Sequence, residues 1–418
     1  MTERGVGIGA PLLAGVLVVG IGLSVRSPIT SVSALLPEIE AADDFSAAGL
    51  ATLSAIPVLL FGLAAPLAPV FARRFGVDRA AAILLTALGV AMLVRPFGPT
   101  ALIAGTVVVG ASISLLGILT PQLVRTHLRR RQGLWSGVYT SVFGVSAALG
   151  AALAMPLFDA LGGDAATALL VWALPICLVA VFALLAAPRL AATATGAGEP
   201  STSAGDGSIL RAPRVWSVTG FFGCQALIYF ALTAWLPTIV IDRGADAATG
   251  GLLLAWLSIA GIPAALLAPT IAARFRSQSA VTSVVSLLSA AGLAGLAFAP
   301  ASWAVAFVAV LGVAQSAAFG LAVGLIVQKA PSAARTASFS AVAQGVGYAV
   351  AALGPLALGM FSTAGVGWST LLAALLGVAA AQLVFGVLAG RPLSPATVSA
   401  PPSPPSHDAE RLEGPHRT

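Results

Sequence analysis

Charge is scarce in this chain. Asp, Glu, Lys and Arg together make up 9% of its 418 residues, whereas 58% are hydrophobic. Soluble domains carry about 25% charged residues, so this composition excludes an ordinary soluble protein. Apolar runs of about 20 residues, the length that crosses the hydrocarbon core of a bilayer, recur along the whole sequence. We therefore predict an all-α polytopic membrane protein.

Cysteine and histidine are nearly absent, with two and three copies. Cys177 and Cys224 lie in different apolar segments, so they suggest neither a disulfide framework nor a clustered metal site, and the histidines are too isolated to form a metal site. The sequence contains no phosphate-binding loop, no zinc-binding pair and no nucleophile with an adjacent base. We therefore expect no cofactor, no metal and no enzymatic activity.

Twelve apolar segments lie between short polar or Gly- and Pro-containing breaks, and each is long enough to cross a membrane as a helix. We place them at residues 8–36, 46–72, 80–97, 100–124, 132–158, 165–188, 214–241, 247–273, 278–299, 302–328, 337–362 and 367–390.

The basic residues select one orientation for these segments. All of the 21 Lys and Arg residues except Arg26, Arg95 and Arg243 fall in the termini or in loops of one parity, and acidic residues gather in the other loops. Positive residues concentrate on the cytoplasmic side of membrane proteins, so both termini are predicted to be cytoplasmic. Orientation then explains the net charge of +6, and no nucleic-acid partner is expected.

A polar stretch rich in Gly, Ser and Thr divides the segments into two groups of six. The pair Ala68-Pro69 in the first group recurs as Ala268-Pro269 in the second, within a longer match, which indicates an internal repeat. We predict two pseudo-symmetric six-helix halves. The domains are an N-terminal half at 1–188, a cytoplasmic linker at 189–213, a C-terminal half at 214–390 and a disordered cytoplasmic tail at 391–418.

Arg26 is the charge placed deepest in an apolar segment, about 27 Å along the first one at 1.5 Å per residue. A charged side chain in hydrocarbon costs about 2.5–3.5 kcal/mol, so it should face protein or water. Pro28 lacks a backbone donor and predicts a bend beside Arg26. A guanidinium there suits a small anion, a carboxylate or a nitro group; the alternative is a structural pairing, for example with Glu38.

Glutamine and tyrosine side chains also fall inside the segments. Gln225 precedes Tyr229 by four residues and Gln344 precedes Tyr348 by four, so each pair shares one helical face. Lipid offers buried amides and phenols no partner, so these faces should look toward a central cavity, or toward other helices as interhelical hydrogen bonds. The predicted substrate-binding residues are Arg26, Gln225, Tyr229, Gln315, Gln344, Tyr348 and Tyr139.

Proton coupling usually requires a titratable group in the pathway, yet no Asp, Glu or His lies in the middle of a predicted segment. Glu38, at the outer end of the first segment, is the predicted proton carrier. Facilitated diffusion, exchange and entry of a protonated substrate stay open as alternatives. For Arg95, near the outer end of the third segment, snorkelling to the interface is a simpler account than a substrate role.

Five runs of sequence carry a resemblance to a known family: RSPITSVSALLPEI, IPVLLFGLAAPLAPVFARRFG, GVAMLVRP, GCQALIYFALTAWLPTIVIDRGADAATGGLL and FSAVAQGVGYAVAALGPLALGMF. They resemble the cyanate permease and nitroimidazole transporter group of the major facilitator superfamily. The resemblance implies a twelve-helix monomer that works by alternating access on small polar or anionic solutes, driven by protons. The superfamily signature Gly-x-x-x-Asp-Arg-x-Gly-Arg-Lys is degraded here, because Pro69 and Arg73 occupy its first Gly and its Asp.

We predict a secondary active transporter in a bacterial inner membrane that moves a cyanate-like anion, a carboxylate or a nitroimidazole-type compound. Its partners would be that small-molecule substrate and the lipid bilayer. A multidrug efflux transporter of the same fold is an alternative, although cationic drugs would favour an acidic cavity residue. A non-transporting membrane receptor or scaffold is a further alternative, which the short loops disfavour.

Overall fold

The computed structural model describes residues 9–35, 38, 39, 53, 56, 57, 59–194, 207–245 and 247–392. Over these residues the chain is largely helical and contains no strand. Eleven helical stretches in this part of the chain are long and apolar enough to cross a membrane. The predicted all-α polytopic fold is confirmed. The second of the twelve predicted segments lies partly outside the described residues, and residues 59–63 within it are helical.

The helices of the N-terminal part follow the predicted segments to within a few residues. α10 differs most, because it continues to Ala194, into the stretch predicted to begin the linker. The helices are α1 (Gly9–Ser24), α2 (Ser27–Ala34), α5 (Leu67–Phe75), α6 (Val77–Val94), α7 (Pro99–His127), α8 (Gln132–Ala160), α9 (Ala165–Val171) and α10 (Ala173–Ala194).

The C-terminal part agrees equally well with the predicted bounds. Residues 393–418, which include most of the tail predicted to be disordered, lie outside the described residues. The helices are the one-turn α11 (Gly207–Leu210), then α12 (Pro213–Asp242), α13 (Ala247–Ala272), α14 (Ser279–Phe298), α15 (Ala304–Lys329), α16 (Thr336–Ala351), α17 (Leu353–Thr363) and α18 (Trp368–Gly390).

Prolines accompany breaks within the membrane-crossing helices. The first crossing is interrupted between α1 and α2, with Pro28 in the first turn of α2. The eleventh is interrupted between α16 and α17, three residues before Pro355. Proline cannot donate the backbone hydrogen bond that would continue the helix, and its ring crowds the preceding turn. The bend predicted beside Arg26 is therefore confirmed.

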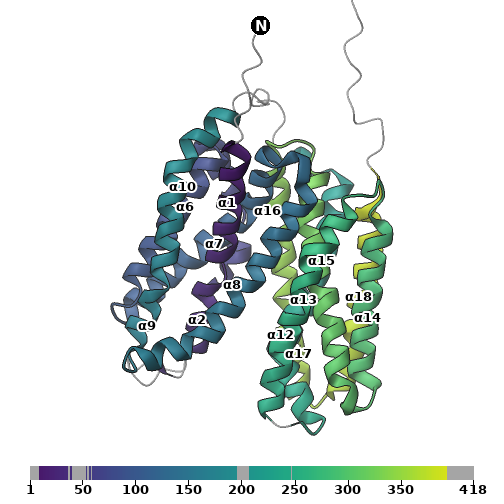
Figure 1. Cartoon of the computed structure of the whole chain (residues 1–418). Helices are drawn as coiled ribbons and strands as arrows, with labels where there is room; N and C mark the ends of the chain where they lie inside the picture. Colours follow the sequence, from purple (N-terminus) through teal and green to yellow (C-terminus); the bar gives the residue numbers. More distant parts are fainter. Residues whose placement is uncertain are drawn as a thin grey trace, which may run out of the picture.

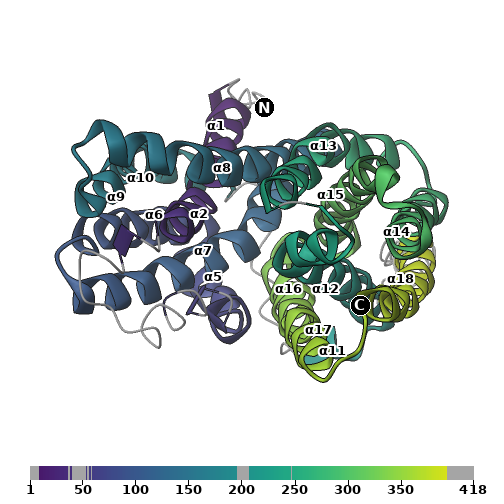
Figure 2. The same ribbon diagram turned by 90° about the horizontal axis from the view of Figure 1, so that it is seen from below.

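The helices form two bundles that lie side by side (Figures 1 and 2). The first bundle contains α1 to α10 and the second contains α12 to α18. In Figure 1 the bundles converge toward the end where the chain begins and diverge toward the opposite end. Val323 and Val327 of α15 and Ala337 and Ala341 of α16 are buried in the apolar core of the first bundle, so the two bundles share a packed interface.

Hydrogen bonds join the bundles near the end that carries Arg125 and the three arginines that follow α7. The guanidinium of Arg125 donates to the backbone carbonyl of Val327 at 2.5 Å. The Thr140 hydroxyl lies 3.2 Å from the backbone carbonyl of Ala265. Both bonds join helices of different bundles, so the bundles are held together toward the end at which they converge in Figure 1.

Close approach of α8 and α13 at this end depends on small residues. A Cβ atom added at Gly137 of α8 would overlap the backbone carbonyl of Leu266 and lie 3.1 Å from its Cα. Backbone atoms cannot move aside as the tip of a flexible side chain can, so the interface has no room for a larger residue at this position.

We expect Gly137→Ala to destabilise the protein by about 1–3 kcal/mol, the usual cost of overpacking. Its apparent melting temperature in detergent should fall by several degrees. Gly144→Ala on the same helix is the matched control, because a Cβ there meets nothing within 4 Å. Alanine favours helix over glycine by about 0.5–1 kcal/mol, so the control should melt at the same or a higher temperature. Equal melting of the two variants would contradict the packing argument.

Candidate functional site

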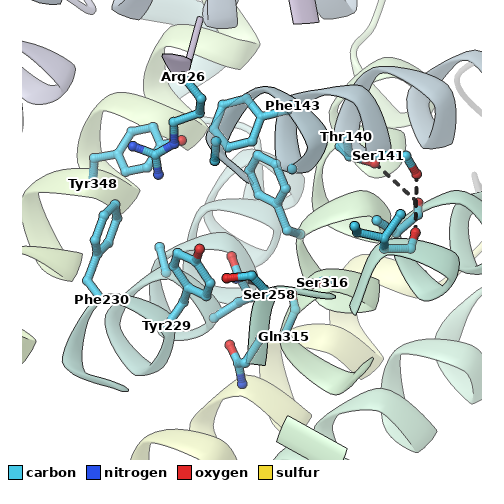
Figure 3. A pocket seen from close by; sticks show the side chains of 17 residues that line it. Arg26, Thr140, Ser141, Phe143, Tyr229, Phe230, Ser258, Gln315, Ser316 and Tyr348 are labelled. Carbon is cyan, nitrogen blue, oxygen red and sulfur yellow. Dashed lines mark hydrogen bonds between the residues drawn. The ribbon is translucent and has the colours of Figure 1, made fainter. Parts of the chain in front are cut away.

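A cavity of about 740 Å³, part of it open, lies between the two bundles. It is lined by side chains of α8 from the first bundle, by α12, α13, α15 and α16 from the second, and by the break between α1 and α2 (Figure 3). The lining residues are Arg26, Thr140, Ser141, Phe143, Gly144, Ala147, Gln225, Ala226, Tyr229, Phe230, Ser258, Ile262, Ala265, Gln315, Ser316, Phe319 and Tyr348.

Arg26 is the one charged residue among the described residues that line this cavity. It occupies the break itself, as the residue that precedes α2, with φ −118° and ψ −40°. Figure 3 shows its side chain extending between Tyr348 and Phe143. The helix break therefore directs the guanidinium away from lipid and into the space between the bundles.

Aromatic rings surround the Arg26 guanidinium. Its Cζ atom lies 4.8 Å from the ring centre of Phe143, 5.9 Å from that of Phe61 and 6.0 Å from that of Phe230. A cation over an aromatic face gains about 0.5–1 kcal/mol when exposed and about 2 kcal/mol when desolvated. Several such contacts are comparable with the 2.5–3.5 kcal/mol that an arginine costs in hydrocarbon. The rings can thus hold the charge without a carboxylate.

Tyr348 continues this aromatic group across the interface. Its ring centre lies 5.1 Å from that of Phe61 in the first bundle. It also lies 5.0 Å from that of Phe222, edge to face, and 6.1 Å from that of Phe230. Edge-to-face and offset rings at these separations attract one another beyond their burial, so this aromatic group contributes to contact between the bundles.

A polar wall of α12 and α15 faces the aromatic side of the cavity. The Gln225 amide donates to the backbone carbonyl of Gln315 at 3.3 Å, and the Gln315 amide donates to the Ser289 hydroxyl at 3.0 Å. The side-chain oxygens of both glutamines are buried and have no hydrogen-bond partner among the described residues. Buried acceptors of this kind are costly unless satisfied, so a donor on a bound molecule that reached them would be stabilised.

The structure brings five of the seven predicted substrate-binding residues to the cavity: Arg26, Gln225, Tyr229, Gln315 and Tyr348. Of the predicted residues, these are the ones that a cavity ligand can reach directly.

Gln344 and Tyr139 are not among the lining residues. The Gln344 amide donates to the Gly117 backbone carbonyl of the first bundle at 3.2 Å and to the Ser340 hydroxyl at 2.7 Å. Tyr139 is buried, with its ring centre 6.2 Å from that of Phe143. Interhelical hydrogen bonding, the alternative weighed from the sequence, describes Gln344 better than substrate contact.

The predicted snorkelling of Arg95 is wrong. Its side chain is 0% exposed, and Nη1 donates to the backbone carbonyl of Pro28 at 2.9 Å. The sequence places Arg95 at the end of a helix, but it cannot show that the loop folds this end against α2. Arg95 therefore contacts the same helix break that carries Arg26.

Asp78, at the end of the degraded signature region, pairs with His127 within the first bundle. His127 Nε2 lies 2.8 Å from Asp78 Oδ1, and both side chains are buried. This pair joins the start of α6 to the end of α7, so Asp78 is used inside one bundle rather than between the two. Glu38 follows α2 and is partly buried, and it is not among the residues that line the cavity.

Phe61, Phe143 and Phe230, together with the hydroxyls of Ser258 and Ser316, are site residues that sequence reasoning missed as charge partners or polar contacts. Each belongs to an apolar stretch of sequence that contains other phenylalanines or serines without such a role. No periodic signal separates them, because their role depends on which helix faces them.

The family model of the Major Facilitator Superfamily matches residues 12–355. The chain belongs to this superfamily. It is a multi-pass membrane transporter with a small-molecule substrate, and the named relatives are transporters rather than enzymes.

Two relatives belong to the group that the sequence resembles. The chain is 34% identical to the 2-nitroimidazole transporter of Escherichia coli (strain K12) over 385 residues, which cover 91% of this chain and 95% of that protein. It is 28% identical to the cyanate transport protein CynX of the same strain over 337 residues, covering 80% and 86% of the two chains. The predicted family is therefore confirmed.

Solved structures of symporters share the fold. The fucose:proton symporter FucP in the outward conformation superposes with a TM-score of 0.71, over 91% of this chain and 100% of that chain, at 12% identity. The proton:xylose symporter XylE superposes with a TM-score of 0.71 over 91% and 94% of the two chains, at 13% identity.

We expect the contact between Arg26 and Phe143 to appear as a coupling energy of about 0.5–2 kcal/mol, the range of cation–π contacts. Arg26→Gln, Phe143→Leu and the double variant would be unfolded by denaturant in detergent without ligand. The coupling is the departure from additivity. A second cycle, with Phe385→Leu in the other bundle, should be additive within about 0.5 kcal/mol. An additive result for Phe143 would contradict the cation–π assignment.

Proposed function

We propose that this transporter carries a small planar anion or nitro compound of the cyanate, carboxylate or nitroimidazole type, with Arg26 as its positive contact. The observation that carries the proposal is the placement of Arg26 as the sole charge among the described lining residues of a cavity between the bundles. A guanidinium presents its N–H donors in one plane, which matches two oxygens of a carboxylate or nitro group.

The remaining walls support the same substrate class. The rings of Phe143, Phe230 and Tyr348 offer flat faces to a planar solute, and Gln225 and Gln315 offer acceptor oxygens to a donor such as a ring N–H. The names of two relatives, a 2-nitroimidazole transporter and a cyanate transport protein, fit such solutes. Tyr229 adds a hydroxyl at the polar wall.

Transport by alternating access follows from a site shared by two bundles. We place both termini in the cytoplasm on the distribution of the arginines. The family resemblance implies a monomer, and the bacterial relatives support a place in a bacterial inner membrane. The end with Arg125, where the bundles converge, is then cytoplasmic, and the opposite end, where they diverge, would give access to the cavity from outside. Relative rocking of the halves at 1–188 and 214–390, joined by the linker at 189–213, would expose it to the cytoplasm.

Efflux of cationic drugs is disfavoured by the same cavity. A cation would meet the positive charge of Arg26 without a compensating acid, because no Asp or Glu is found among the described residues that line the site. Attraction of an anion and repulsion of a cation by one fixed charge give the site its selectivity.

We expect Arg26→Gln to reduce uptake of 2-nitroimidazole or cyanate into proteoliposomes at least about tenfold, because a charge-assisted hydrogen bond is lost. Uptake by Arg26→Lys, which keeps the charge but not the planar donors, should lie between that of the wild type and that of Arg26→Gln. Arg79→Gln is the control, since Arg79 is exposed at the start of α6. Wild-type uptake by Arg26→Gln would refute the assignment of Arg26.

Glu38 as a proton carrier stays a prediction, and an imposed pH gradient tests it. We expect the gradient to stimulate uptake by the wild type and to lose this effect in Glu38→Gln, because the amide cannot bind and release a proton. Asp159→Asn at the outer end of α8, where the side chain is exposed, should keep the stimulation. Equal stimulation of Glu38→Gln and wild type would remove Glu38 from the mechanism.

A further inference from the structure

The break between α1 and α2 is held by a side chain of α8. In an uninterrupted helix the Ser27 N–H would donate to the carbonyl of Leu23, four residues earlier. Here the Ser27 N–H donates to Ser146 Oγ at 3.0 Å. The Ser146 hydroxyl in turn donates to the Leu23 carbonyl at 2.5 Å. The Ser146 hydroxyl is thus inserted into the helical ladder and replaces one backbone hydrogen bond by two.

The region around this insertion is tightly packed. Ser146 is 1% exposed, so water cannot take the place of its hydroxyl. One turn further along α8, Gly150 lies against the same break: a Cβ there would overlap the Thr30 hydroxyl and lie 2.7 Å from Ser27 Cα. α8 and α2 therefore contact each other closely beside the insertion.

Arg95 holds the break from another direction. Its Nη1 donates to the Pro28 carbonyl, while Nε and Nη2 are buried without a hydrogen-bond partner among the described residues. Arg26 lies between the two carbonyls that are held in this way, those of Leu23 and Pro28. Its backbone position is consequently set by α6 and α8 as well as by its own helix.

We propose that Ser146 is a positioning residue for transport: its hydroxyl completes the broken ladder between Leu23 and Ser27 and so sets the direction in which Arg26 enters the cavity. This inference rests on the proposed function. The same helix places Phe143 beside the guanidinium and bonds Thr140 to α13 of the other bundle. Through Ser146, the position of Arg26 depends on the position of α8.

Uptake kinetics with 2-nitroimidazole and cyanate as probes test this role. Ser146→Ala should raise KM about three- to tenfold, as expected for loss of buried hydrogen bonds, without a matching loss of folded protein. Ser286→Ala is the matched control, because Ser286 is equally buried but bonds to Thr282 of its own helix, and it should leave KM unchanged. An unchanged KM in Ser146→Ala would overturn the proposal.

Epistasis separates positioning from general packing. If Ser146 acts through Arg26, Ser146→Ala should change the residual uptake of Arg26→Gln by less than about twofold. A packing role would lower uptake by the same factor in both backgrounds, which would overturn the proposal. If the alanine variant does not fold, Ser146→Cys replaces it, because cysteine keeps the shape of serine while its larger sulfur weakens both hydrogen bonds.

Hydrogen exchange of the ligand-free protein gives a readout that does not depend on transport. Peptides covering residues 23–30 should exchange faster in Ser146→Ala than in wild type, whereas Ser286→Ala should match wild type there. If the wild type moves neither probe, the proposed function fails while this exchange result still tests the insertion. Unchanged exchange in Ser146→Ala would overturn the inference by itself.

Discussion

The structure depends on one costly constraint, a permanent positive charge placed partway along a membrane-crossing helix. Lipid cannot solvate the Arg26 guanidinium, so the protein must supply its surroundings. It does so with aromatic faces from both bundles, because Phe61 and Phe143 belong to the first and Phe230 to the second. The charge is therefore compensated at the interface between the bundles, where rocking of the bundles would change its environment.

Much of this arrangement depends on α8. Within about two turns it bonds to the other bundle through Thr140, places Phe143 beside Arg26 and inserts Ser146 into the helix break. A helix whose backbone bonds are satisfied internally can carry these three contacts as one rigid element. In the proposed mechanism, movement between the bundles would therefore change both the cation–π contact and the orientation of the guanidinium.

The helix bounds were predictable because apolar length and Gly or Pro breaks are local properties of a membrane-spanning sequence. Arg26 was also predictable, since its cost is high wherever the helix lies. Gln344 and Tyr139 were expected at the substrate but are not among the lining residues, because helical spacing defines a face without defining its neighbour. Arg95 was wrongly predicted to reach the membrane surface, because its actual partner, Pro28, lies 67 positions away in the sequence.

The sequence by itself determined that this protein lies in a membrane, where its helices run, and that one buried charge needs a partner. Composition and the length of apolar runs are enough for this, because each residue has its own free energy of transfer from water to lipid. Only the tertiary structure decided which partner that charge receives. Aromatic side chains are common in apolar helices, and they become ligands of a cation only where packing brings their faces within about 6 Å of it. The same packing placed Ser146 in the break between α1 and α2, a contact that the residues around Ser146 in the sequence do not predict.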